Sequence, residues 1–130
     1  MPDYMITEKE RLHLRELAKK QLEYSRLPVM MERTRHWHDN NSLKSDKPVI
    51  VVEHGPFKDE LFPGLGCETA AGIAVEKELL SHITSFELIN DDKVVPDFFS
   101  VNRKIKIREL DQERIVHRAK DAGGRELGYS

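Results

Sequence analysis

Three residues of this sequence could bind a ligand through their side chains. Glu53 and His54 directly follow a run of β-branched residues, and open α/β sheets place ligand-contacting groups at such strand ends. The alternative is an ordinary strand end whose charged side chains turn to solvent. Arg103 falls on the apolar side of an alternating segment, where its guanidinium could bind an anion. A β-bulge that rotates Arg103 outward, or a partner carboxylate, would also explain its position.

Metal-binding and nucleophilic residues are harder to find. Cys67 precedes a predicted helix, whose macrodipole would lower a thiol pKa, but the acidic residue after it opposes that shift and no partner His stands at a recognisable spacing. Glu78 and His82 share a helix face, yet only one such pair is present. His36 and His38 would point about 200° apart on a helix. We therefore expect no metal ligands and no catalytic residues on this chain.

Three helices are predicted to position these groups. The first covers residues 7–25, because Thr7 and Glu10 match a capping box and leucines recur after them at helical spacing. The second covers residues 28–40 and has a proline in its first turn, where the missing N–H costs nothing. The third covers residues 68–89 and carries an apolar stripe that is broken by Asn-Asp-Asp.

A small mixed sheet is predicted beside the helices. Residues 48–53 are a continuous β-branched run, typical of a strand covered on both faces. Residues 98–108 alternate apolar and polar side chains, and residues 110–130 contain a hairpin around Gly123-Gly124. The predicted fold class is α+β: three helices packed on a small mixed sheet with a C-terminal β-hairpin, not a complete TIM barrel.

These elements form a single predicted domain over residues 1–130. Its parts are a helix pair (7–40), a strand–helix–strand unit (48–108) and the hairpin (110–130). The predicted core consists of Leu14, Leu17, Leu22, Trp37, Val49, Val51, Val75, Leu79, Ile83, Phe86, Val101 and Ile105.

The charge balance argues against nucleic-acid and membrane partners. The 130 residues carry a formal charge of −2, so no global positive field attracts phosphates. Neither a membrane-spanning run nor an apolar signal core is visible, and the expected compartment is the cytoplasm. The net charge is +2 over residues 1–47 (10 basic, 8 acidic), −7 over 48–100 (3 and 10) and +3 over 101–130 (8 and 5). The basic ends can lie against the acidic middle of the same chain or of a second copy, and a homodimer is expected.

Several phrases, read in order, resemble the N-terminal portion of the uroporphyrinogen-decarboxylase-like methyltransferases of anaerobic bacteria, which are associated with corrinoid-dependent methyl transfer. They are RLHLRELAKKQLEYSRLPVMMERTRHWHDNNSLKSDKPVIVVE, the Cys67-Glu68 helix entry, INDDKVVPDFF and VHRAKDAGGRELGY. The resemblance runs through nearly the whole chain and rests on order and phrasing, not on a catalytic motif.

The resemblance implies a (β/α)₈ barrel enzyme, but a barrel takes about 250 residues and this chain is too short to build one. Zinc-using members hold the metal with a His-x-Cys element and a later Cys. This sequence has one cysteine and no His-x-Cys, so no metal ligands carry over. The Arg-rich substrate-anchoring phrase of the true decarboxylases is also missing, and PVIVVEHGPF stands in its place.

Two functions follow from the resemblance. The chain can be a non-catalytic stand-alone relative of the methyltransferase N-terminal region, acting as an assembly or accessory module or arising from a split or truncated gene. Alternatively, it is one part of a corrinoid-dependent methyltransferase whose catalytic barrel is on another chain. In either case, corrinoid or zinc is expected only through a partner chain. The expected partners are a second copy, a methyltransferase barrel or a corrinoid protein.

Overall fold

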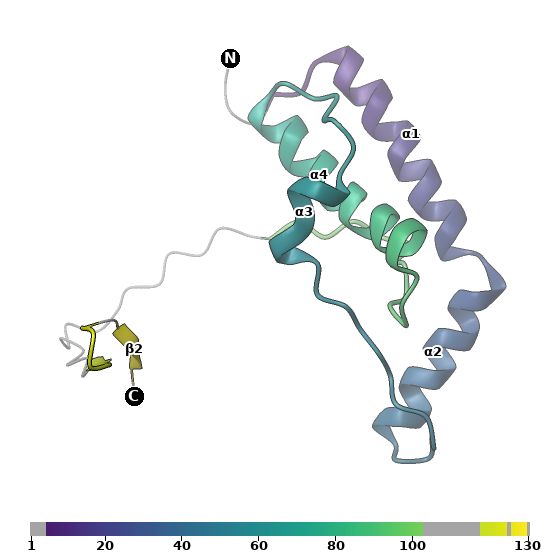
Figure 1. Cartoon of the computed structure of the whole chain (residues 1–130). Helices are drawn as coiled ribbons and strands as arrows, with labels where there is room; N and C mark the ends of the chain where they lie inside the picture. Colours follow the sequence, from purple (N-terminus) through teal and green to yellow (C-terminus); the bar gives the residue numbers. More distant parts are fainter. Residues whose placement is uncertain (1–4, 103–117, 125, 130) are drawn as a thin grey trace, which may run out of the picture. The chain divides into compact units, whose positions relative to one another are not determined.

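The chain divides into two units, Met1–Ser100 and Val101–Ser130. The computed structural model describes residues 5–102, 118–124 and 126–129. The first unit is helical, and the strands described belong to the second (Figure 1). No helix among the described residues is both long enough and apolar enough to cross a membrane.

The first unit is built around two helices that pack along each other, α1 (Glu8–Ser25) and α4 (Ala70–Thr84) (Figure 1). The predicted capping box of α1 is confirmed: the Thr7 side chain accepts from the Glu10 N–H, and the Glu10 carboxylate accepts from the Thr7 N–H. At its other end α4 continues into one π-helical turn, η2 (Ser85–Ile89). The first and third predicted helices are therefore present, within one or two residues of their expected bounds.

A second predicted helix, α2 (Pro28–Asn41), is also confirmed and is held by polar contacts to the segment after η2. The buried Arg33 guanidinium donates to the Lys93 carbonyl at 2.9 Å. The Trp37 indole N–H donates to the Asp92 carbonyl at 2.8 Å. These bonds satisfy carbonyl groups that lie outside regular secondary structure.

Between α2 and α4 the chain is mostly irregular, and residues 53–66 contain three glycines and two prolines, which disfavour regular elements. Two short turns interrupt it, the 3₁₀ turn η1 (Gly55–Phe57) and the single helical turn α3 (Lys58–Leu61).

The apolar core is small and lies between α1 and α4. Leu14, Cys67 and Leu79 are its buried centre, with Leu17, Ile73 and Val75 packed partly buried against it. Ile83, another predicted core residue, is also buried. The prediction was wrong for Val51 and Val101, which are 41% and 84% exposed.

The α+β fold class is wrong, because the predicted mixed sheet is not formed by the described residues. Residues 48–53 pair with no strand in the described part of the chain, and the β-branched run expected to be covered on both faces is exposed: Ile50 at 62% and Val52 at 43%. The N–H groups of these two residues bond to the carboxylates of Asp92 and Asp91 at 2.7 Å, in place of a neighbouring strand. Residues 98–102 form no strand either, and residues 103–108 lie outside the described part.

The second unit contains a two-stranded antiparallel ribbon. Strand β1 (Arg118–Lys120) pairs with β2 (Glu126–Tyr129), and the strands described here pair only with each other. The predicted turn at Gly123-Gly124 lies between them. The Asp121 carboxylate accepts from the Gly123 N–H at 2.9 Å, and Gly124 has φ +79°, a conformation that glycine adopts without strain.

Candidate functional site

A buried carboxylate on α4, that of Glu76, connects three parts of the helical unit. Its side chain is 1% exposed. One oxygen, Oε1, accepts from the Gly66 N–H at 2.8 Å and lies 2.7 Å from His13 Nε2 on α1. The other, Oε2, accepts from the Cys67 N–H at 2.9 Å. Burial opposes ionisation, but these hydrogen bonds outweigh it and hold the pKa of Glu76 below its ordinary value.

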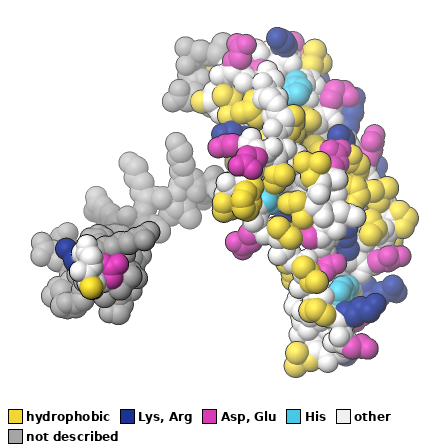
Figure 2. Space-filling view, in the orientation of Figure 1, with side chains coloured by type: hydrophobic (Ala, Val, Ile, Leu, Met, Phe, Trp, Pro, Cys, Tyr) yellow, Lys and Arg dark blue, Asp and Glu magenta, His cyan; other side chains and the backbone are white. Residues whose placement is uncertain are grey.

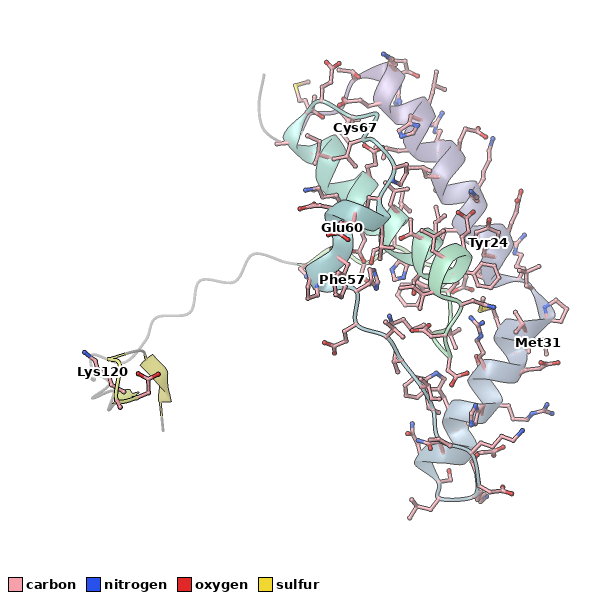
Figure 3. The ribbon with its side chains drawn as sticks, viewed as in Figure 1. Tyr24, Met31, Phe57, Glu60, Cys67 and Lys120 are labelled. Atoms are coloured by element: carbon pink, nitrogen blue, oxygen red, sulfur yellow. The ribbon has the colours of Figure 1, made fainter. Side chains whose placement is uncertain are left out.

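The Cys67 thiol lies beside this carboxylate, between α1 and the start of α4 (Figure 3). It is a free cysteine, 5% exposed. Burial, followed by the hydrogen bond and the negative charge of Glu76, raises the pKa of Cys67 from 9.0 to about 11. The thiol is therefore protonated at neutral pH and is a poor nucleophile.

A second buried carboxylate, that of Glu10, lies beside the same turn. It accepts from the Thr7 N–H at 2.8 Å, from the Glu68 and Thr69 N–H groups at 2.7 Å each, and from the Thr69 hydroxyl at 3.1 Å. The bond from the Thr69 N–H is the largest of the causes that lower the pKa of Glu10 to about 2. Glu10 is thus an anion that caps the starts of both α1 and α4.

His13, Cys67 and Glu76 form a cluster with metal-ligating side chains. One ligand atom from each residue lies within 4.8 Å of the others, and the set offers nitrogen, sulfur and oxygen donors. Sequence reasoning examined Cys67 but missed the other two, because no short spacing joins them. A signal was present: Glu76 falls on the apolar stripe of its helix, three residues before Leu79 and seven before Ile83.

A separate cavity of about 500 Å³ lies next to η2 and contains His54, one of the predicted ligand-binding residues. His54 is 8% exposed, and its Nε2 lies 3.5 Å from the Ser81 hydroxyl. Its Nδ1 and the Ser85 hydroxyl are buried and have no hydrogen-bond partner among the described residues. The cavity walls come from Arg33, Trp37, His54, Ser81, His82, Ser85, Phe86, Asp91, Lys93, Val94 and Val95.

Of the other residues considered from the sequence, His82 lines the cavity, whereas Glu53 and Glu78 do not. Glu53 is exposed. Arg103 lies outside the described residues. Glu78 and His82 form a surface pair on α4, with 3.3 Å between the carboxylate and the ring nitrogen.

Residues 48–52 present an unusual main-chain edge. One side of this segment is bonded: the Ile50 and Val52 N–H groups donate to Asp92 and Asp91, and the Ile50 carbonyl accepts from the Asp92 N–H at 3.0 Å. The alternate residues of an extended chain face the other way. The main chain of Val51 makes no hydrogen bond to any residue that the structure describes.

Comparison of the chain with models of protein families, with curated protein sequences and with solved structures finds no match in any of the three.

Proposed function

We propose that this chain is a non-catalytic accessory module of the cytoplasm, which docks on the barrel of a uroporphyrinogen-decarboxylase-like methyltransferase in the way that the N-terminal region of such an enzyme would. The observation that carries the proposal is the open edge of residues 48–52. We refer to this segment as the docking edge.

Two hydrogen bonds from alternate residues hold the docking edge in place. Asp91 and Asp92 bond one side of it, so the free side is preorganised and little conformational entropy is lost when a strand pairs there. Strand addition to an exposed edge is a common mode of recognition, with main-chain hydrogen bonds giving affinity and side-chain pockets giving specificity. The three exposed apolar side chains of Ile50, Val51 and Val52 supply the area to be buried.

Apolar side chains that follow the docking edge in the sequence are exposed as well. Phe57 is 55% exposed and Leu65 is 40% exposed. Figure 2 shows apolar side chains over much of the visible face of the helical unit. An extended apolar segment with an open edge is a hazard unless a partner covers it. This supports an assembly role over that of an isolated monomer.

In the absence of the barrel, a second copy of the chain is the partner that we propose for the docking edge. The docking edges of two copies can pair across a two-fold axis, and the free main-chain groups of both edges then bond to each other. Homodimer and barrel complex are then competing states of one surface, so each should weaken the other.

The test is binding to a uroporphyrinogen-decarboxylase-like methyltransferase from which the N-terminal region has been removed. Sedimentation velocity should show a complex of the two chains. Val51→Lys should weaken the complex at least 10-fold, because a charge on the edge opposes strand pairing. Leu43→Lys is the matched control, since Leu43 is 93% exposed and lies outside the docking edge.

The same mixture distinguishes the two functions. An accessory module forms the complex and adds stability to the barrel without changing which reaction it performs. Methyl transfer that requires both chains and is abolished by a change within this chain would favour the split methyltransferase instead. Absence of a complex at tens of micromolar would contradict both.

A further inference from the structure

We infer that His13, Cys67 and Glu76 form a binding site for one zinc ion, with a fourth position open to solvent. The site lies within the isolated chain and does not involve the docking edge. Zinc would therefore bind without a partner chain, contrary to the expectation from the sequence.

The electrostatics of the buried turn favour a cation. Glu10 and Glu76 are 4% and 1% exposed, and both are anions. Neither carboxylate forms an ion pair with a Lys or Arg among the described residues. Glu76 pairs with the His13 side chain instead. Buried charges in proteins are normally paired or coordinate a metal. A divalent cation beside Cys67 would neutralise this excess of negative charge.

The geometry is close to that of a zinc site. Ligand atoms at 2.0–2.3 Å from one zinc ion lie about 3.3–3.8 Å from one another. The 2.7 Å separation of His13 Nε2 and Glu76 Oε1 must open by about 1 Å, and the widest separation in the cluster, at most 4.8 Å, must close by about the same amount. Rotation of the His13 side chain, which is 41% exposed, can provide much of this adjustment.

The surroundings already orient the ligands. The Gly66 and Cys67 N–H groups bond to the two oxygens of Glu76, which fixes the plane of the carboxylate. Gly66 also leaves room for the imidazole, because a Cβ at that position would lie 2.9 Å from His13 Nε2. With Cys67 and Glu76 buried and His13 half-exposed, the open position would lie on the solvent side.

Binding requires a defined proton balance. The Cys67 thiol loses its proton to solvent and binds as a thiolate. His13 binds through Nε2 as a neutral ring with its proton on Nδ1. Zinc has no redox chemistry and prefers tetrahedral sites with N, S and O donors, so no oxidant or reductant is needed. Because one thiol proton is released, affinity should rise with pH below the thiol pKa.

The test uses the full chain, stripped of metal with a chelator and titrated with Co²⁺ and then Zn²⁺. Wild type should bind one Co²⁺ with a thiolate charge-transfer band and intense visible bands typical of tetrahedral cobalt, and Zn²⁺ should displace it stoichiometrically. Cys67→Ala should abolish the charge-transfer band, and His13→Gln should weaken binding at least 10-fold. Circular dichroism of the metal-free variants checks that they retain the helices.

His82→Gln is the matched control, because His82 also pairs with a glutamate on α4 but lies outside the cluster. It should bind Co²⁺ like wild type. The inference is overturned if folded wild type binds less than about one tenth of an equivalent. It is also overturned if Cys67→Ala keeps the same spectrum and affinity, or if His82→Gln loses them.

Discussion

The Glu10 carboxylate and the Thr69 main chain join the starts of two helices that lie far apart in the sequence. Glu10 completes the capping box of α1 and also accepts from the Thr69 N–H at 2.7 Å. Thr69 is itself the N-cap of α4, and its hydroxyl accepts from the Gly72 N–H at 3.1 Å. One carboxylate thus fixes how α1 and α4 begin relative to each other, next to the Cys67 cluster.

Gly72→Ala should destabilise the protein by about 1–3 kcal/mol through overpacking of this junction. In most helices the same change is favourable, because alanine has the higher helix propensity. Here the added Cβ would lie 2.8 Å from the Thr69 hydroxyl and 2.9 Å from Glu10 Oε1. Urea unfolding measures the effect. Gly64→Ala is the control, since its Cβ would meet nothing within 4 Å; equal stability of the two variants would contradict the account.

Acid should remove the stability that Glu10 contributes. Its pKa is about 2 in the folded protein against an ordinary 4.5, so the unfolded chain binds the proton more tightly. The contribution is therefore complete above about pH 4.5 and is lost as the pH falls toward 2. Glu10→Gln should be less stable than wild type near neutrality, and the difference should shrink across this window. A difference that stays constant with pH would show that the carboxylate charge is not responsible.

Leu79→Ala should cost about 2–5 kcal/mol of unfolding free energy, because Leu79 is 3% exposed at the centre of the core and alanine would leave a cavity. Leu12→Ala on α1 is the matched control, since Leu12 is 56% exposed. Its unfolding free energy should stay within about 0.5 kcal/mol of wild type. A loss below about 0.5 kcal/mol for Leu79→Ala would show that the α1–α4 interface is not the core.

Cys67 should react slowly with iodoacetamide in the metal-free folded protein. The rise of its pKa from 9.0 to about 11 reduces the thiolate fraction at neutral pH about 100-fold. Burial of the thiol slows the reaction further by limiting access of the reagent. Glu76→Gln removes the negative charge beside the thiol and should speed alkylation. The measurement is the rate of mass increase in native buffer against that in urea. Equal rates in the two conditions would contradict the buried, protonated thiol.

The helices could be predicted because their signals are local. Thr7 with Glu10, Pro28 in a first turn, and the spacing of Val75, Leu79 and Ile83 each specify a helix within a few residues. Such patterns require only that one face find a partner, and the interface of α1 with α4 provides it.

The sheet was mispredicted because a β-branched run specifies an extended chain but not its partner. Residues 48–52 form no strand, and Asp91 and Asp92 supply the hydrogen bonds that a neighbouring strand would have given. A pairing between main-chain donors and two acidic side chains some 40 residues away leaves no periodic trace in the sequence.

The metal-ligating cluster was missed for a related reason. His13 and Glu76 are 63 positions apart, and only the packing of α1 on α4 brings them together with Cys67. His54, by contrast, was singled out from the sequence; it lines a cavity, and its ligand-contacting role stays a prediction.

If residues 48–52 form a docking edge, the purified chain should associate through it, and sedimentation equilibrium at micromolar concentration measures this association. Without a barrel partner, wild type and Leu43→Lys should both sediment as dimers, at twice the 15.1 kDa chain mass. Val51→Lys should sediment as a monomer of 15.1 kDa with unchanged helical content. A wild-type monomer, or a dimer that survives Val51→Lys, would contradict the account.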